Sequence, residues 1–281
     1  EKKLINDNTY KTGSYYRFFP IVGVSHETPF KIKNYSSRLT FTPKINFTIS
    51  PGSSNSSKIS NEDSTNNDFS NDNMYTLNRY SGTDKMDNSK RITYGLFANT
   101  ESIKSSLSQS YEFTDNSNFH KEQGNDKNLS DLLGSFEYLK TNELSYYFRY
   151  DVDEEFIKSQ NLKLKSPTRI GELNISYLDQ NSKVNDIITK DVETINYGFS
   201  SKKFSKFSKI ELSGLYNLKK EINTEYSIGY SYFDECFGIN LDFSRKSYEE
   251  DNLKPQDILT IMFSFKNVGS YRSTNLAVSE N

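Results

Sequence analysis

The sequence has few of the residues with which soluble proteins build a core. Apolar residues make up 33 % of its 281 residues, against about 45–50 % in a typical globular protein, and the mean hydropathy is -0.78. It has no run of about 20 apolar residues, the length that a membrane-spanning helix needs. Only two alanines occur, Ala98 and Ala277, so intrinsic propensity favours strands over helices. These absences exclude a helical membrane protein and predict an all-β chain.

Cysteine, histidine and net charge are also scarce. The single cysteine, Cys236, excludes disulfide bonds within the chain and any zinc site built on cysteines. The two histidines, His26 and His120, lack the spacing of a metal site, and we interpret both as ordinary surface residues. The 35 basic and 37 acidic residues leave a net charge of -2, which would not attract nucleic acid. We therefore expect no enzyme activity, no cofactor, no metal and no nucleic-acid partner.

What the sequence does contain is aromatic residues in alternating patterns. It has 20 Phe and 20 Tyr, too many for a disordered chain. From about residue 91 onward, apolar and polar residues alternate in short runs, which is typical of strands with one apolar face. Near the end of the chain we expect these residues to face lipid: Phe237, Ile239, Leu241, Phe243, Leu259, Ile261, Phe263 and Phe265. On the opposite side of the later strand we expect Thr260, Met262 and Ser264 to face the interior of a barrel.

The alternation predicts about thirteen strands. They lie near 15–24, 38–49, 91–99, 102–113, 131–140, 143–151, 154–165, 169–178, 192–200, 207–217, 221–232, 236–246 and 257–267. Alternation alone fits a β-sandwich as well as a barrel, because the polar face meets water in both. Aromatic residues at the ends of many runs resemble the girdles at the two lipid–water interfaces. We therefore predict an antiparallel transmembrane β-barrel. The odd strand count indicates either that further strands lie outside this chain or that the count itself is wrong.

Two polar stretches and two prolines interrupt the pattern. Residues 50–73 are nearly all Ser, Asn, Asp and Lys, a composition that predicts a long loop or a disordered insert. Residues 114–130 form a second polar loop. Pro20 and Pro43 lie inside predicted strands, and proline removes a hydrogen bond from the ladder. We expect those strands to be edge-like, bulged or locally weak.

Several ordered motifs resemble a known family. They are NEDS at 61–64, NRYSGTDK at 78–85 and YGL at 94–96, followed by blocks at 109–111, 130–134, 232–237, 243–245 and 263–269. The resemblance as a whole spans about residues 15–270. This pattern is similar to the C-terminal barrel domain of the LptD (OstA/Imp) family, the lipopolysaccharide-assembly proteins of the Gram-negative outer membrane.

The resemblance implies a fold and a function. Residues 1–281 would be the C-terminal part of one outer-membrane β-barrel, with a long polar loop at about 50–90. The soluble jelly-roll and the first strands would precede this chain. The barrel would translocate lipopolysaccharide and insert it into the outer leaflet without chemistry on the substrate. The implied partners are lipopolysaccharide, the plug lipoprotein LptE, the periplasmic bridge protein LptA and the outer-membrane lipids.

Few individual residues carry over from the resemblance. Cys236 matches a C-terminal cysteine that family members link to their N-terminal domain, but Glu235 stands where some members have a second cysteine. One such link is implied here at most, and an unpaired thiol is the alternative. The strand at 257–267, with Thr260, Met262 and Ser264, matches one side of the lateral seam of the family. A porin-like diffusion channel and a secreted β-sandwich adhesin remain alternative functions.

Overall fold

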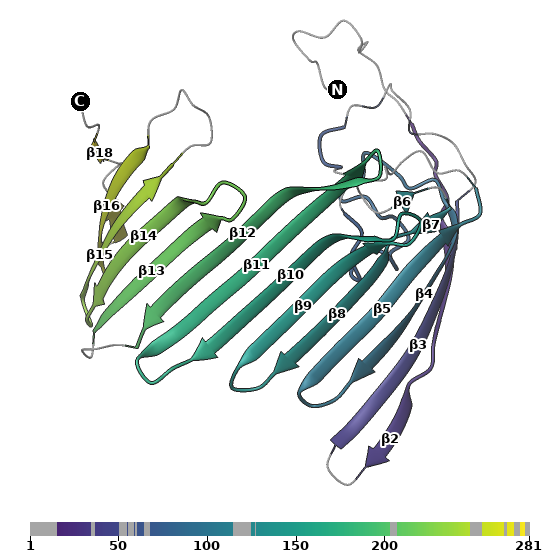
Figure 1. The fold of residues 1–281 in the computed structure, drawn as a ribbon, viewed down its shortest axis with the longest axis horizontal. Helices are drawn as coiled ribbons and strands as arrows, with labels where there is room; N and C mark the ends of the chain where they lie inside the picture. The colour runs from purple at the N-terminus through teal and green to yellow at the C-terminus, as the bar shows by residue number, and fades with distance from the viewer. Residues whose placement is uncertain are drawn as a thin grey trace, which may run out of the picture. The chain divides into compact units, whose positions relative to one another are not determined.

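The computed structural model describes residues 16–34, 37–50, 55, 59, 61–64, 68–114, 125–126, 128–202, 207–247, 255–266, 269–272 and 276–278. All of its regular elements are strands, and neighbouring strands pair antiparallel (Figure 1). The predicted all-β class is therefore confirmed. Among these residues there is no helix with the length and apolar character needed to cross a membrane.

The chain divides into two compact units, and the division falls inside three strands. Unit 1 comprises Glu1–Phe136 with Phe148–Ile157, and unit 2 comprises Glu137–Tyr147 with Lys158–Asn281. The strands up to the division are β1 (Val22–Glu27), β2 (Phe30–Asn34), β3 (Ser37–Ile49), β4 (Lys90–Asn99), β5 (Ile103–Glu112), β6 (Asn125–Asp126) and β7 (Leu129–Ser130). Those that the division crosses are β8 (Leu132–Leu139), β9 (Glu143–Asp151) and β10 (Phe156–Pro167).

Strand β3 is the centre of the ladder at the start of unit 1. One of its edges pairs with β4, which pairs in turn with β5. Its other edge pairs with β2 from Ser37 to Phe41 and with β1 from Lys44 to Ile49. Between β1 and β2 the ladder is interrupted at Thr28 and Pro29, opposite Pro43. The predicted local weakness at Pro43 is thus confirmed.

Unit 2 is a meander in which each long strand pairs with the next. Its strands are β11 (Gly171–Val184), β12 (Ile187–Ser201), β13 (Ser208–Asn217), β14 (Ile222–Phe233), β15 (Phe237–Lys246), β16 (Gln256–Phe265), β17 (Gly269–Arg272) and β18 (Leu276–Val278). Short turns join β11 to β12, β13 to β14 and β14 to β15 (Figure 1). Because β15 occupies one edge of β16, the short strands β17 and β18 pair with its other edge.

The predicted strands agree with these elements except at the start of the chain. The strand predicted at 15–24 is wrong, because residues 16–21 are not in a strand and Pro20 precedes β1. The count of about thirteen is too low, because the short strands β2, β6, β7, β17 and β18 carry too few residues to show alternation. For the same reason, 257–267 is not the last strand of the chain.

In the first strands of unit 1 the usual distribution of burial is reversed. These polar residues of β3, β4 and β5 are buried: Asn46, Thr48, Arg91, Thr93, Ser106, Ser108, Ser110 and Glu112. These apolar residues of the same strands are exposed: Phe47, Ile49, Tyr94, Leu96, Leu107 and Tyr111. A soluble protein buries its apolar face instead. The reversal is what a sheet shows when its apolar face contacts lipid and its polar face is covered by protein.

One prediction concerns close packing in the β12–β13 hairpin. Gly214 lies opposite Tyr197, and a Cβ at Gly214 would lie 2.3 Å from the Tyr197 ring. Gly214→Ala should displace this ring and lower the free energy of unfolding by about 1–3 kcal/mol. Gly198 lies next to Tyr197 in β12, where a Cβ would meet nothing closer than 3.6 Å. Gly198→Ala should therefore be tolerated. The heat-induced gel shift of the full-length protein in detergent measures both, and equal midpoints would contradict the prediction.

Candidate functional site

The candidate site is the polar face of unit 1 and the segment that covers it. We call the described residues 61–64 and 68–89, between β3 and β4, the insert. Its backbone accepts a hydrogen bond from Asn46 in β3, at 3.1 Å, through the Tyr75 carbonyl. Its side chains reach β5, where Tyr75 Oη donates to Ser108 Oγ at 3.0 Å and Asn71 donates to Ser106 at 2.6 Å. The insert thus crosses three strands and buries their polar side chains.

A small apolar cluster fixes the insert to the neighbouring strand. Phe69, Met74 and Tyr80 of the insert pack with Leu133 of β8, and all four are buried. Tyr75 packs against this cluster from the side. The sequence did not predict this cluster, because Phe69, Met74 and Tyr80 are isolated among Ser, Asn and Asp. The predicted long loop at about 50–90 is therefore a packed segment wherever the structure describes it.

A buried cluster of four charged side chains lies where the insert meets the sheet. Arg79 donates from Nε to Asp87 Oδ2 at 2.6 Å and from Nη2 to Glu112 of β5. Arg91 of β4 donates from Nη1 to Asp87 Oδ2 at 2.9 Å. The Ser89 hydroxyl lies 2.7 Å from Glu112 Oε2 and donates to it. The four charged side chains are at most 1 % exposed, so two positive and two negative charges cancel out of contact with water.

This charge cluster is stable only as a complete set. Removing an ion from water costs several kcal/mol, which opposite charges and hydrogen bonds repay only when every member is present. Burial disfavours the charged form of Arg79, but the nearby Asp87 and Glu112 carboxylates outweigh burial and raise its pKa. The Arg79 guanidinium also stacks 4.6 Å from the centre of the Phe69 ring, which joins the charge cluster to the apolar cluster.

The motifs at 61–64 and 78–85 hold each other through two aspartates. The Asp63 carboxylate accepts hydrogen bonds from the Asp84 amide at 2.9 Å and from the Thr83 amide at 3.0 Å. In return, the Asp84 carboxylate accepts hydrogen bonds from the Glu62 amide at 2.7 Å and from the Asp63 amide at 3.0 Å. The Asp84 amide contributes most to holding the pKa of Asp63 well below its usual range; burial opposes it, and the amide and hydroxyl of Thr83 add to the lowering. We call this arrangement the aspartate clamp.

Gly82 is required for the aspartate clamp to close. Its φ is +78°, a conformation that side chains with a Cβ rarely adopt. A Cβ at this position would lie 2.4 Å from the Asp63 carbonyl oxygen. Arg17, from the segment before β1, then donates to the carbonyl oxygens of Thr83 and Asp84. The SGTD sequence is therefore explained by the geometry of the turn that it forms.

A second ion pair joins the insert to β9. Arg149 lies 3.0 Å from Asp68 of the insert and 3.1 Å from Asp131, which precedes β8. Asp131 is buried, whereas the Asp68 side chain is 64 % exposed, so the pair with Asp131 is the one shielded from water. Strands β4, β5 and β9 therefore all contribute charged side chains to the contacts of the insert.

The residues predicted near the end of the chain share faces as expected from alternation. Phe237, Ile239, Leu241 and Phe243 lie opposite Phe265, Phe263, Ile261 and Leu259 respectively, so all eight lie on one face of β15 and β16. On the other face Thr260, Met262 and Ser264 lie opposite Asp242, Asn240 and Gly238. The assignment of these faces to lipid and to the barrel interior stays a prediction.

The predicted disulfide residue lies in the turn between β14 and β15. Cys236 is exposed, and its thiol is free in this chain. Its backbone amide donates to Asp234 at 2.9 Å, as does the amide of Phe237 at 2.8 Å. These two hydrogen bonds, in that order, lower the pKa of the Asp234 carboxyl. His26 lies in β1 and is exposed, whereas His120 and most of the loop predicted at 114–130 lie outside the described residues.

The buried charge cluster was missed from the sequence, although a signal for it exists. Arg91 and Glu112 occupy positions in β4 and β5 that alternate with Ile92 and Tyr111, so both point to the polar face. They also lie directly opposite each other in the register. Charged residues at such positions need partners, and the Arg and Asp at 79 and 87 are candidates in the adjacent segment.

The first prediction for this site tests the charge balance. Arg79→Met removes one of the two buried cations and leaves excess negative charge, which should destabilise unit 1 by about 3–5 kcal/mol. The double variant Arg79→Met with Glu112→Leu removes one charge of each sign and should recover much of the loss. The measurement is the midpoint of heat-induced unfolding, with Lys104→Met as the control for loss of an exposed cation on β5. No difference between the single and double variants would contradict this account.

The second prediction tests the aspartate clamp. Because each carboxylate accepts amides from the other motif, Asp63→Asn and Asp84→Asn should be non-additive, with a coupling of about 0.5–3 kcal/mol. The rate of protease cleavage within the insert of the folded protein reports the opening of the clamp. Asp72→Asn, an exposed carboxylate of the same insert, is the control. Strictly additive effects of the two clamp variants would show that the motifs act independently.

Comparison with known protein families identifies a relationship. A family model described as LptD, LPS transport system D, matches residues 3–222, which include the insert and every strand from β1 to β13. A search of curated proteins found no match. The matched family consists of transport proteins of the Gram-negative outer membrane, and its β-barrel class agrees with the antiparallel strands and the reversed burial described above. With more than half of its length matched, this chain belongs to the LptD family of lipopolysaccharide transport proteins.

Proposed function

We propose that this chain is the C-terminal part of the barrel through which lipopolysaccharide crosses the outer membrane and enters its outer leaflet. The observation that carries the proposal is the family match over residues 3–222. Within this proposal the protein acts as the barrel component of a translocon and performs no chemistry on its substrate. The soluble jelly-roll and the first strands of the barrel belong to a part of the protein that precedes residues 1–281.

The polar face of unit 2 supports passage of a saccharide. Across β11 to β15 one row of neighbouring residues in the register is short and polar: Asn174, Gly198, Ser213, Ser227 and Ser244. Ser213 and Ser227 share a hydrogen bond of 2.8 Å, which keeps both hydroxyls close to the sheet. Short side chains leave room beside the sheet, and hydroxyl and amide groups can exchange hydrogen bonds with a sugar. The acyl chains must leave sideways into lipid, which requires a weak seam between strands.

We place the seam beside β16. Thr260, Met262 and Ser264 would face the barrel interior there, and the eight apolar residues of β15 and β16 would face lipid. Support comes from the edge of β16 that does not pair with β15. There β17 and β18 contribute only four and three residues. Short pairings of this kind break more easily than the full-length ladder between β15 and β16.

The proposal extends to partners on the periplasmic side. The turn that holds Cys236 follows β14, whereas the turns at 185–186 and 218–221 lie at the other ends of these strands. We assign the end with Cys236 to the periplasm, the side on which the preceding soluble domain would lie. An exposed thiol there would form a disulfide in that oxidising compartment with a cysteine of the preceding soluble domain. The same domain would receive lipopolysaccharide from the bridge protein LptA, and the lipoprotein LptE would occupy the barrel as a plug.

The experiment that tests the proposal is photo-cross-linking in living cells. A photoreactive amino acid replaces Thr260 or Ser264 in the full-length protein, with Ile261 on the opposite face as the matched control. We expect an adduct with lipopolysaccharide at Thr260 and Ser264 that disappears when upstream transport is blocked. Absence of this adduct, together with steady ion conductance in bilayers, would instead favour a porin-like channel.

The proposed disulfide has its own test. On a non-reducing gel, the full-length protein from cells should migrate differently from the reduced protein, and Cys236→Ser should abolish that difference. Ser231→Cys, on β14 rather than in the turn, controls for disulfide formation by any added thiol. Identical migration of the wild-type protein with and without reductant would show that Cys236 is a free thiol in the cell.

A further inference from the structure

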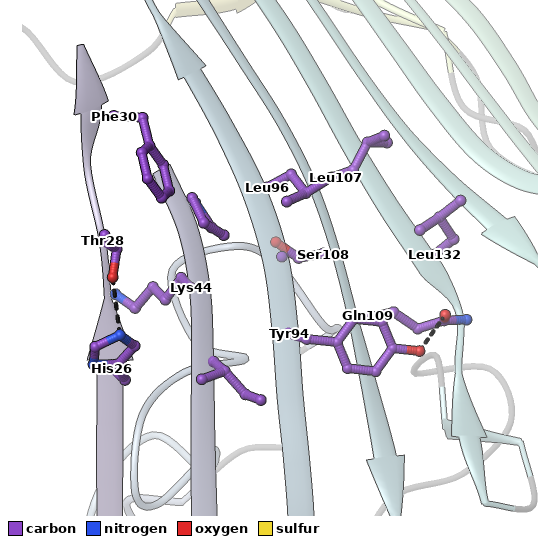
Figure 2. Close-up of a pocket in the computed structure, with 13 residues that line it drawn as sticks. His26, Thr28, Phe30, Lys44, Tyr94, Leu96, Leu107, Ser108, Gln109 and Leu132 are labelled. Carbon is purple, nitrogen blue, oxygen red and sulfur yellow. Dashed lines mark hydrogen bonds between the residues drawn. The ribbon is translucent and has the colours of Figure 1, made fainter. Parts of the chain in front are cut away.

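A hollow of about 620 Å³ lies on the exposed apolar face of unit 1 (Figure 2). Strands β1 to β5 and β8 contribute its walls. Its apolar lining comes mainly from Phe30, Pro43, Ile45, Leu96, Leu107 and Leu132. This volume is within the range of about 300–1,000 Å³ that small-ligand sites occupy. The hollow is continuous with the face whose leucines and aromatic residues are exposed, and that face is the lipid-contacting side of an LptD-family barrel.

The hollow results from the interruption between β1 and β2. Along the ladder, Pro43 lies opposite Leu96, which lies opposite Leu107. On the other side of Pro43 the ladder is broken, and only the Thr28 amide donates to the Pro43 carbonyl, at 3.2 Å. The neighbouring positions carry large side chains, Phe30 on one side and His26 on the other. The row that contains Pro43, Leu96 and Leu107 has only small side chains at its β1–β2 end, whereas the rows on either side have large ones. This difference leaves a groove across the strands.

The polar groups at the rim of the hollow are occupied by one another. Tyr94 Oη donates to Gln109 Oε1 at 2.9 Å, and His26 Nε2 and Thr28 Oγ1 share a hydrogen bond of 2.9 Å (Figure 2). The Lys44 ammonium lies 3.5 Å from Glu27 and 4.9 Å from the centre of the Tyr75 ring, a residue of the insert on the polar face. The surface left for an occupant is therefore almost entirely hydrocarbon, and it suits an apolar chain rather than a head group.

The position of the hollow along the strands indicates which leaflet it meets. The turn from β4 to β5, at 100–102, is short, whereas the long insert leaves from the opposite ends of β3 and β4. Short turns of outer-membrane barrels face the periplasm. Leu96 and Leu107 lie in the halves of β4 and β5 nearest to that short turn, and Phe30 begins β2, which lies farthest from the insert. The hollow therefore opens toward the inner leaflet, which is made of phospholipid.

We propose that this hollow binds one acyl chain of an inner-leaflet phospholipid. The chain replaces the side-chain packing that is missing where β1 and β2 separate, and it supports β1 and β2 against β3. Binding is determined by shape and apolar contact, because the lining is mainly apolar and the polar groups named above already have partners within the chain. This inference goes beyond lipopolysaccharide transport and requires only that the outer face of unit 1 contacts lipid.

The test uses a phosphatidylethanolamine that carries a diazirine in the middle of one acyl chain. The full-length protein is reconstituted in nanodiscs with this lipid, irradiated, and mapped by mass spectrometry of its peptides. We expect several-fold more adducts on the peptides with Leu96 and Leu107 than on the peptide with Leu212. Leu212 is a matched control, because it lies on the apolar face of β13 and is 41 % exposed, against 44 % for Leu107. Adduct formation at the hollow should saturate and be displaced by unlabelled lipid.

Two variants fill the hollow. Leu107→Trp should reduce the adducts at Leu96 to the level of Leu212, whereas Leu212→Trp should leave them unchanged. Leu96→Phe replaces Leu107→Trp as the test, with adducts read at Leu107, if the tryptophan variant does not show the heat-induced gel shift of the folded barrel. Equal numbers of adducts at the hollow and at Leu212 would show that the lipid at the hollow is ordinary boundary lipid. That result would overturn the proposal. Adducts with lipopolysaccharide in preference to the phospholipid would overturn its assignment to the inner leaflet. Neither result bears on the photo-cross-linking at Thr260 and Ser264.

Discussion

The fold of unit 1 depends on keeping four buried charges together. Strands with one apolar face leave the other face polar, and a polar face that is covered by protein must find all of its hydrogen bonds within that protein. Arg79 and Asp87 of the insert meet Arg91 and Glu112 of the strands, so the insert and the sheet supply hydrogen-bond partners to each other. Without Arg79 and Asp87, the insert would bury Arg91 and Glu112 and offer them no oppositely charged partner.

The same alternation produces two different polar faces. In unit 1 the polar face is covered by the insert, and its side chains include long charged ones such as Arg91 and Glu112. In unit 2 the row from Asn174 to Ser244 consists of short residues, two of which, Ser213 and Ser227, hydrogen-bond to each other. The face covered by the insert has specific contacts from long side chains, whereas the row of short side chains in unit 2 leaves space beside the sheet, as the proposed passage of a saccharide requires.

The sequence predicted the long strands well because alternation is a local property. A period of two over eight or more residues identifies β4, β9 or β15 without knowledge of any partner strand. The short strands and the packing of the insert were not predictable in this way. Arg79 meets Glu112 only because β4 and β5 pair in one register, and a shift by one residue would turn Glu112 to the opposite face. The family motifs at 61–64 and 78–85 were identified, but their reason, the reciprocal amide bonds of Asp63 and Asp84, required coordinates.

The contacts of the insert also differ in their spacing along the chain. Asp63 and Asp84 are separated by 21 residues, and both lie in the segment before β4. Arg79 and Glu112 are separated by 33 residues, and Glu112 ends β5. Closing a shorter loop costs less entropy, so the aspartate clamp is able to form while the later strands are still unpaired. The charge cluster closes only after β5 has joined β4 in register. In a chain with a misaligned β5 the charge cluster would not form, and its charged side chains would stay exposed to water.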